Sequence, residues 1–238
     1  MTRTAIIAAM PAELKPLTRG WRHSRSNCVD LWHKSFDGGE WIAACAGAGV
    51  ERASRAFAEV EKSGPIDKVI SVGWAGALRE ELASGQAYDV SCVIDARTGE
   101  RFVTSIPPND SWLVTSPKVA DAAEKQRLAS TYQAALVEME AAGIARLARM
   151  RGIPFYCIKG ISDGYIDKLP DFNRFISKNG QFLLAHFVFF VLPRPWYWPA
   201  LIRMGENSRK AARAIAASVL DLLDERGHQD KLNGNPNH

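Results

Sequence analysis

The chain has 238 residues, of which 47% are hydrophobic and 24% are charged, and its formal net charge at pH 7 is +4. These values are those of an ordinary globular protein, and the length favours one large domain over two small ones. The basic residues lie mainly on helix-like segments and form no single dense patch. A nucleic-acid-binding protein is therefore not expected.

Cysteine usage and the N-terminus bound the class further. Cys28, Cys45, Cys92 and Cys157 show no CxxC spacing, so neither a metal site nor a disulfide framework is expected. The last three lie in apolar runs, where a free thiol packs as a small hydrophobe. The N-terminus lacks the pattern of a signal peptide. We expect a cytoplasmic protein.

Strand-like and helix-like segments alternate along the chain. Strands are predicted over 4–9, 41–46, 68–73, 87–94, 134–137 and 155–161, and helices over 50–62, 120–130 and 139–151. This alternation predicts a single α/β domain with a mostly parallel sheet and helices on both sides. The domain is expected to span 1–226, and the polar tail 227–238 is expected to be disordered.

Carboxylates follow three of the predicted strands. Glu13 comes after the first strand, Glu138 and Glu140 after 134–137, and Asp163 after 155–161. Ligands of open α/β sheets bind outside the carboxyl ends of the strands, so these groups are expected to face one crevice and to perform acid/base chemistry. Acids in such positions can also be helix caps or solvated loop residues.

Two glycine turns also follow strands. The first is Gly47-Ala48-Gly49 before Val50, and the second is Gly73-Trp74-Ala75-Gly76-Ala77. Their N–H groups can face an oxyanion, a phosphate or a sugar hydroxyl. Neither turn matches a dinucleotide fingerprint or a phosphate loop, and a turn that simply needs a small residue explains each one equally well.

Four motifs in order resemble the purine nucleoside phosphorylase/nucleosidase superfamily, and most closely its 5′-methylthioadenosine/S-adenosylhomocysteine nucleosidase branch. They are Ala9-Met10-Pro11-Ala12-Glu13, Val72-Gly73-Trp74-Ala75-Gly76, Val137-Glu138-Met139-Glu140 and Ile161-Ser162-Asp163. The resemblance spans about residues 4 to 175 and the final helix. It implies a three-layer α/β/α domain with a mixed, mostly parallel sheet, and a homodimer.

The resemblance also implies roles for individual residues. Asp163 would protonate or hydrogen-bond N7 of the leaving base, Glu140 would bind the ribose hydroxyls, and Glu13 would activate the attacking water. Met139 would pack on the sugar. The other substrate-binding residues implied are Glu138, Ser162, Gly73, Trp74, Ala75, Gly76, Val119, Gly49 and Val50. No metal or cofactor is expected.

The chain departs from the superfamily pattern at several positions. Trp74 stands where related nucleosidases usually carry a serine, and Ser71 stands where phosphorolytic relatives often carry a phosphate-binding arginine. Water is therefore favoured over phosphate as the nucleophile, although Arg52 or Arg79 could contact phosphate. Segment 116–120, which usually supplies an aromatic stack for the base, has no aromatic residue. Adenine specificity is therefore open.

The segment 182–204 is strongly apolar and aromatic. It is too short to span a bilayer, and three interpretations remain: a buried helix or dimer interface, a lid over an apolar substrate tail, or a membrane-surface contact. Segments 116–125 and 194–203 resemble hopanoid-associated phosphorylases, which release adenine from an adenosylated lipid. That resemblance implies a bulky apolar 5′-substituent. His186 is expected to be a core histidine.

The sequence thus predicts an N-ribosyl hydrolase that acts on an adenine-type nucleoside. One alternative is a phosphorylase of the same fold, with phosphate as co-substrate and an adenosyl-lipid such as adenosylhopane as substrate. Another is a non-catalytic protein that binds nucleosides or a membrane surface. The expected partners are a small-molecule nucleoside and a second copy of the chain, with a possible peripheral membrane contact through 182–204.

Overall fold

The computed structural model describes residues 2–167, 170–175 and 183–233. Its eleven strands in this part of the chain form one sheet in the order β2-β3-β4-β1-β5-β10-β9-β7-β8, with β11 paired to β5 and β6. The strands are β1 (Thr2–Ala8), β2 (Arg22–Ser26), β3 (Val29–Phe36), β4 (Gly39–Cys45), β5 (Lys68–Ala77), β6 (Ala87–Asp89), β7 (Cys92–Asp95), β8 (Arg101–Val103), β9 (Trp112–Thr115), β10 (Leu136–Glu138) and β11 (Phe155–Asp163).

The long strand β5 is the hub of the sheet. It pairs in parallel with β1 and β11, and its last residues pair in antiparallel with the first residues of β10, so the sheet is mixed, as expected. The predicted strand 87–94 is two separate strands, β6 and β7, which pair with different neighbours. Strands β2, β3, β8 and β9 were not predicted from the sequence.

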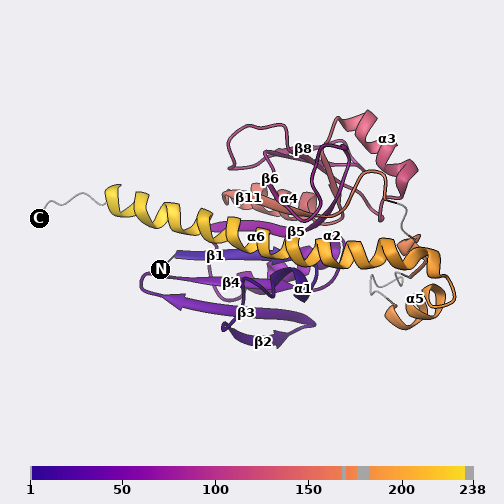
Figure 1. Ribbon diagram of the computed structural model, residues 1–238. Coiled ribbons are helices and arrows are strands. Elements are labelled where there is room, and N and C mark those ends of the chain that lie inside the picture. Colours follow the sequence, from indigo (N-terminus) through magenta and orange to yellow (C-terminus); the bar gives the residue numbers. More distant parts are fainter. Residues whose placement is uncertain (1, 168–169, 176–182, 234–238) are drawn as a thin grey trace, which may run out of the picture.

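Helices cover both faces of the sheet and complete the three expected layers (Figure 1). Helices α2 (Val50–Glu61) and α4 (Ala141–Arg151) contribute to the core on one face, and α1 (Pro11–Leu14) and α6 (Trp198–Asn233) to the core on the other. In β1, Ala5 and Ile7 belong to the first core and Ile6 and Ala8 to the second, because successive side chains of a strand point to opposite faces. Both faces of the central strands are therefore apolar.

The predicted helices are confirmed with small shifts at their ends. Helix α3 (Ala122–Tyr132) begins at Asp121, whose side chain accepts a hydrogen bond from the Glu124 N–H. Helix α4 ends at Gly152, which takes a left-handed conformation. Cys45, Cys92 and Cys157 are buried, as expected of packed thiols, and Cys28 is exposed.

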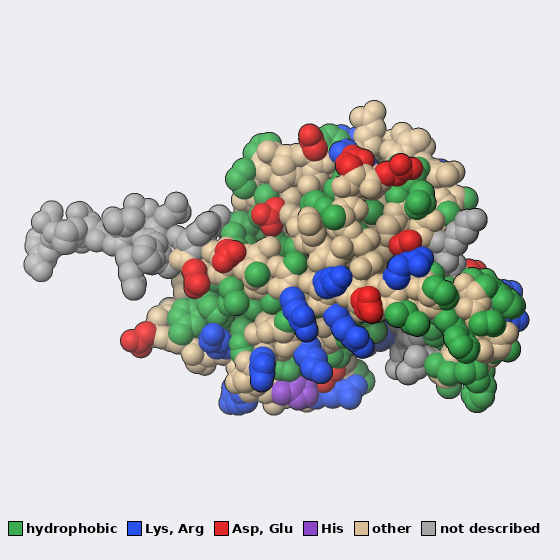
Figure 2. All heavy atoms as spheres, viewed as in Figure 1, with side chains coloured by type: hydrophobic (Ala, Val, Ile, Leu, Met, Phe, Trp, Pro, Cys, Tyr) green, Lys and Arg blue, Asp and Glu red, His purple; other side chains and the backbone are tan. Residues whose placement is uncertain are grey.

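The apolar segment 182–204 folds as helix α5 (Leu184–Val191), the short 3₁₀ helix η2 (Pro195–Tyr197) and the start of α6, and its first residue lies outside the described residues. The expectation of a helix buried within the chain is wrong, since much of this segment is exposed. His186 is exposed as well, so it is not a core histidine. Figure 2 shows apolar side chains gathered at this end of the molecule. We call the exposed residues of this segment the apolar patch: Val188, Phe189, Leu192, Trp196, Trp198 and Ile202.

Helix α6 runs along the molecule from the end that carries α5 (Figure 1). It reaches Asn233, so it includes the first part of the tail that was expected to be disordered, and residues 234–238 of that tail lie outside the described residues. Within the described part of the chain, none of the helices combines the length and the apolarity that a bilayer crossing requires.

Candidate functional site

Glu13 is buried where α1 follows β1. Its Oε2 accepts hydrogen bonds from the N–H groups of Ala9 and Met10, at 2.9 and 2.7 Å, and its Oε1 accepts one from the Trp74 N–H at 2.8 Å. Burial raises the pKa of Glu13, and these N–H groups and the charge of Lys159 offset part of that effect. The carboxylate is therefore fixed against β5 and is more basic than usual.

Gly73 makes this approach possible. Its φ is +140°, and a Cβ at this position would lie 2.8 Å from Glu13 Oε1. Both the backbone conformation and the contact require glycine. The predicted second glycine turn is wrong, because residues 73–77 continue strand β5; within that strand, Gly73 accommodates a predicted catalytic carboxylate.

Glu138 and Lys159 form a buried ion pair, with Lys159 Nζ 3.2 Å from Glu138 Oε2. Glu138 also accepts hydrogen bonds from the Thr115 hydroxyl at 2.6 Å and from the N–H groups of Glu140 and Ala141 at 2.9 and 2.8 Å. Both of its oxygens are thereby engaged by protein groups. Glu138 organises the site and does not present a free oxygen to a ligand.

Glu140 lies half-buried at the start of α4. Its Oε1 accepts a hydrogen bond from the Gly49 N–H at 2.6 Å, which joins the first glycine turn to the site. Burial and the neighbouring Glu138 carboxylate raise the pKa of Glu140 to about 8, although Lys159 acts in the opposite direction. Glu140 therefore keeps its proton to a higher pH than an ordinary glutamate does.

Lys159 is the positive charge that these acids share. Burial lowers its pKa, but the carboxylates Glu138, Glu140 and Glu13 raise it more, and the net shift is upward. Its ammonium also donates to the Ser71 hydroxyl and the Val72 carbonyl. Sequence analysis missed Lys159, yet a single lysine within the apolar run 155–161 was a usable signal for a buried charge.

Asp163 ends β11 and is paired with a lysine that the sequence did not single out. Its Oδ2 lies 2.5 Å from Lys125 Nζ, and its Oδ1 accepts a hydrogen bond from the Ser162 hydroxyl at 2.6 Å. Lys125 comes from α3, is 3% exposed and donates also to the Gly164 carbonyl at 2.7 Å. The sequence of α3 gave no sign of this role, because Lys125 stands among charged residues typical of a solvated helix face.

Strand β5 connects Glu13 with Asp163. Gly73 contacts Glu13, whereas a Cβ on Gly76 would lie 3.1 Å from Asp163 Oδ2 and 3.1 Å from Lys125 Cε. The predicted acids at the ends of the first and last strands thus both lie against the last part of strand β5, Glu13 at Gly73 and Asp163 at Gly76. Glu140 joins them electrostatically, since Glu13 contributes to its pKa shift.

The remaining predicted binding residues have mixed positions. The Trp74 indole N–H donates to the Ser208 carbonyl of α6, so the ring is held by that helix while its backbone N–H serves Glu13. The Ser162 hydroxyl oxygen lies 3.3 Å from the Ala75 carbonyl oxygen, and Val50 packs against Gly143. Met139 is half-buried beside Glu140.

Val119 ties the predicted base-pocket segment to the apolar end of the molecule. Its N–H donates to Asn173 Oδ1 and its carbonyl accepts from Asn173 Nδ2, both at 2.9 Å. Asn173 belongs to the 3₁₀ helix η1 (Phe172–Phe175), whose Phe172 and Phe175 rings contact Phe187 of α5. The apolar segment is therefore continuous with the predicted pocket.

The two arginines considered for a phosphate contact are both engaged. Arg52 donates to the Ala46 carbonyl beside the first glycine turn, and Arg79 donates to the Gln133 carbonyl. Neither is part of the carboxylate cluster. Among the described residues, no three His, Cys, Asp or Glu side chains are grouped so as to hold a metal ion.

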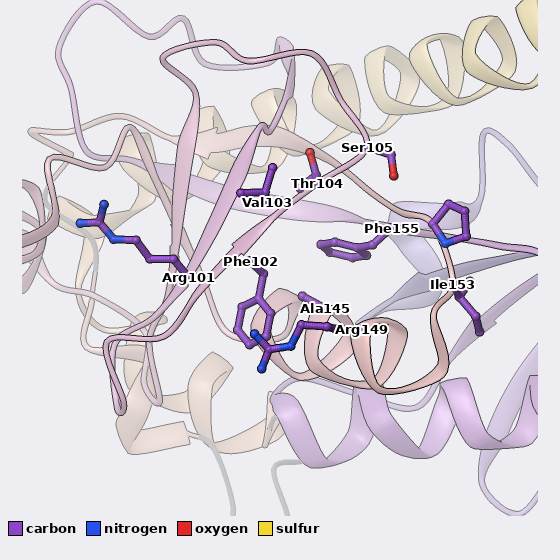
Figure 3. Close-up of a pocket in the computed structure, with 10 residues that line it drawn as sticks. Arg101, Phe102, Val103, Thr104, Ser105, Ala145, Arg149, Ile153 and Phe155 are labelled. Atoms are coloured by element: carbon purple, nitrogen blue, oxygen red, sulfur yellow. The ribbon is translucent and has the colours of Figure 1, made fainter.

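A surface pocket of about 360 Å³ lies elsewhere (Figure 3). Arg101 and Phe102 of β8, Arg149 of α4 and Phe155 of β11 are among its lining residues. Phe155 is the first residue of β11, whereas Asp163 is its last, so this pocket is at the opposite end of the strand from the carboxylates. It is not the candidate site.

The sequence pattern of one family, the phosphorylase superfamily, matches residues 3–118 and 98–186. The chain belongs to the phosphorylase superfamily. This membership confirms the resemblance seen in the four motifs. No curated protein sequence matches the chain.

Solved structures of other superfamily proteins are similar to this one at low sequence identity. A putative 5′-methylthioadenosine/S-adenosylhomocysteine nucleosidase from Francisella philomiragia is 18% identical with a TM-score of 0.72, covering 94% of this chain and 99% of its own. A futalosine hydrolase from Helicobacter pylori is 16% identical with a TM-score of 0.70, covering 94% and 98%. The 5′-methylthioadenosine nucleosidase of Arabidopsis thaliana is 16% identical with a TM-score of 0.72, covering 99% and 97%. These likenesses establish the fold of the superfamily member.

Proposed function

We propose that this protein is an N-ribosyl hydrolase that cleaves the N-glycosidic bond of a purine nucleoside, of adenine type. The observation that carries the proposal is that three acids lie near the end of strand β5. Glu13 and Asp163 contact Gly73 and Gly76, and Glu140 interacts electrostatically with Glu13. Carboxylates on either side of a glycosidic bond perform its hydrolysis. The similar structures support the proposal, since they include nucleosidases and a hydrolase that act on nucleosides.

Glu13 is the general base of the proposed reaction. Its carboxylate is immobilised by three backbone N–H groups and has a pKa raised by burial. A base whose pKa is nearer to neutrality takes a proton from water more effectively as the bond to C1′ forms. Water is the nucleophile of this proposal, because Glu13 provides a base for it and Ser71 stands where phosphorolytic relatives often carry a phosphate-binding arginine.

Glu140 binds the ribose. Its carboxyl is held by the Gly49 N–H and carries a raised pKa, so it can donate or accept a hydrogen bond with the 2′- and 3′-hydroxyls. Binding of a hydroxyl donor and the positive charge that develops on the sugar both favour its ionised form. The site therefore gains negative charge beside the sugar when the bond breaks.

Asp163 faces the base, with Ser162 and Lys125 fixing its two oxygens. A leaving purine takes up a proton or a strong hydrogen bond at N7 so that it departs without a full negative charge. The position of Asp163 at the end of β11, packed closely against Gly76 of β5, supports this assignment, because the carboxylate lies at the strand ends where ligands of such sheets bind.

The 5′-substituent is proposed to be bulky and apolar. Val119 is tied by Asn173 to η1, and η1 contacts α5, so an apolar surface begins at the predicted pocket. A long apolar chain on the 5′-carbon would extend from the predicted pocket toward the exposed apolar residues of α5. A methylthio group would leave most of these residues uncovered.

The apolar patch is proposed to contact a lipid surface. Phe189 is 76% exposed and Trp196 is 67% exposed, and the charged residues among these aromatics, Arg194 and Arg203, are basic. Exposed aromatics with basic residues are typical of interfacial segments. In Figure 2, Lys and Arg side chains are gathered over the middle and lower part of this face, and a few of them lie toward the apolar end.

Co-sedimentation with vesicles tests the lipid contact. We expect binding to phosphatidylglycerol-rich vesicles that is weaker on phosphatidylcholine and is lost in a Phe189→Ser, Trp196→Ser variant. Val103→Ser is the matched control, since Val103 is 81% exposed on another part of the surface. A variant that changes the elution volume in gel filtration and not vesicle binding would instead make the patch an interface with a second copy of the chain.

Release of free base tests the reaction itself. The substrates are 5′-methylthioadenosine, S-adenosylhomocysteine and an adenosine with a long apolar 5′-chain, each with and without phosphate. Release without phosphate is expected, and fastest for the long chain. Release that requires phosphate would make the protein a phosphorylase, and binding without release would make it a nucleoside-binding protein.

A further inference from the structure

Lys125 lies against Asp163, the residue assigned above to the leaving base. Its Nζ lies 2.5 Å from Asp163 Oδ2 and 2.7 Å from the Gly164 carbonyl, and the side chain is 3% exposed. An ammonium group has three N–H donors. These two contacts, within the described part of the chain, use two of them.

We propose that Lys125, and not Asp163, supplies the proton to the leaving base. This inference rests on the proposed function, because it assumes that the base lies against Asp163. The third N–H of Lys125 would donate to N7, while the Asp163 carboxylate stays ionised and holds the ammonium in place. Asp163 is then a positioning residue and Lys125 a catalytic one.

The charges explain why this arrangement suits the site. The carboxylate of Asp163 already accepts hydrogen bonds from Ser162 and Lys125, which is the pattern of an ionised carboxylate in a charge-assisted pair. The lysine–aspartate pair keeps a transferable proton and has no net charge.

The step balances as follows. The C1′–N9 bond breaks and its electron pair goes to the base, while N7 takes a proton from Lys125 Nζ. Lys125 becomes a neutral amine, and the base leaves as a neutral molecule. The water oxygen bonds to C1′ and gives its proton to Glu13. Solvent returns a proton to Lys125 after the base has left, and Glu13 loses its own to solvent.

Two substrates with different leaving groups test the proposal. Adenine needs a proton to leave, whereas 4-nitrophenolate from 4-nitrophenyl β-D-ribofuranoside does not. Lys125→Met should lower the rate of adenine release by a factor on the order of 10² to 10⁴, the range for loss of a general acid, and lower 4-nitrophenolate release less than about tenfold. Equal losses on both substrates, or no loss on either, would overturn the proposal.

Lys125→Arg separates proton donation from charge. Arginine retains the ion pair with Asp163 but does not give up a proton in proteins. The proposal predicts that Lys125→Arg stays as slow in adenine release as Lys125→Met; recovery to wild-type rate would show that only the charge matters. Arg127→Met is the matched control on the same helix, because Arg127 is exposed and pairs with Glu124. Circular dichroism confirms that each variant is folded.

A binding measurement keeps the proposal testable if no substrate is turned over. Adenine has an acceptor at N7, and 7-deazaadenine has a C–H there. By calorimetry, the wild type should bind adenine more tightly than 7-deazaadenine, and Lys125→Met should bind the two equally. If the wild type bound both bases equally, Lys125 would make no contact with N7 and the proposal would be wrong, whether or not the protein is a hydrolase.

Discussion

The ammonium of Lys159 and the carboxylate of Glu138 lie 3.2 Å apart, and both side chains are 1% exposed. Lys159 also interacts electrostatically with Glu13 and Glu140, so one cation acts on three acids of the site. Replacing it leaves those acids without a counter-charge, which costs roughly 3–5 kcal/mol for a buried pair. Lys159→Met should lower the free energy of unfolding in urea by about that amount.

An exposed ion pair provides the comparison for Lys159. Lys62 pairs with Glu59 and is 61% exposed at its side chain, so Lys62→Met should change the free energy of unfolding by less than about 1 kcal/mol. If Lys159→Met were as stable as Lys62→Met, the buried acids would not need the charge of Lys159, which would contradict the prediction.

Glu140 should make stability depend on pH. Its pKa is raised from 4.5 to about 8 by burial and by Glu138, so between these values the native state holds a proton that the unfolded state releases. Unfolding is then favoured as pH rises, and this contribution is fully lost above about pH 8. The melting temperature of the wild type should fall relative to Glu140→Gln from pH 5 to pH 8 and then level off.

Glu80→Gln serves as the control for this effect, because Glu80 is an exposed carboxylate outside the site. The melting temperature of Glu80→Gln should differ from that of the wild type by the same amount at every pH. A constant difference between the wild type and Glu140→Gln would contradict the raised pKa.

Asp163→Asn should lower turnover by a factor on the order of 10² to 10⁴, because the Lys125 ammonium loses its charged partner at the base. Affinity for a nucleoside should change much less, since Asp163 makes only part of the binding surface. Steady-state rates together with equilibrium binding measure both quantities. Asp110→Asn, in an exposed loop, should behave as the wild type. Wild-type turnover in Asp163→Asn would remove Asp163 from the reaction.

Gly73→Ala should disturb Glu13 through a single added carbon. The new Cβ would lie 2.8 Å from Glu13 Oε1 at a φ of +140°, and a residue held in such a backbone region costs roughly 1–3 kcal/mol. We expect lower stability in chemical denaturation and strongly reduced base release. Gly20→Ala is matched to it, since Gly20 also has a positive φ but no atom within 4 Å of an added Cβ. If Gly73→Ala and Gly20→Ala were equally active, the close contact between position 73 and Glu13 would have no effect on the reaction.

Asn173→Ala should act on the 5′-end of the substrate. It removes both hydrogen bonds that tie Val119 to η1, and therefore loosens the connection between the pocket and α5. The KM for an adenosine with a long apolar 5′-chain should rise more than the KM for 5′-methylthioadenosine. If the KM rose equally for both substrates, the apolar segment would have only a structural role.

Much of this architecture follows from the sequence because the central strands are buried on both faces and read as apolar runs. The edge strands were missed for the opposite reason: β2 has the sequence Arg22–Ser26, which is mostly exposed and polar and carries no periodic signal. At the site, glutamates after strands were visible, but their partners were not. Lys125 meets Asp163 across 38 positions of sequence, and helical periodicity alone places such a lysine in solvent.

The hydrogen bonds of the carboxylates have a consequence for how activity appears during folding. Glu13 is fixed by an N–H 61 positions away along the chain, and Glu140 by one 91 positions away in the other direction. Residues close in sequence are therefore not enough to orient the carboxyl group of either glutamate. In a partly folded chain both glutamates are present, but these distant N–H groups do not yet hold them in position. Enzymatic activity should therefore return only at the last stage of refolding, and it would report the completed sheet more strictly than circular dichroism does.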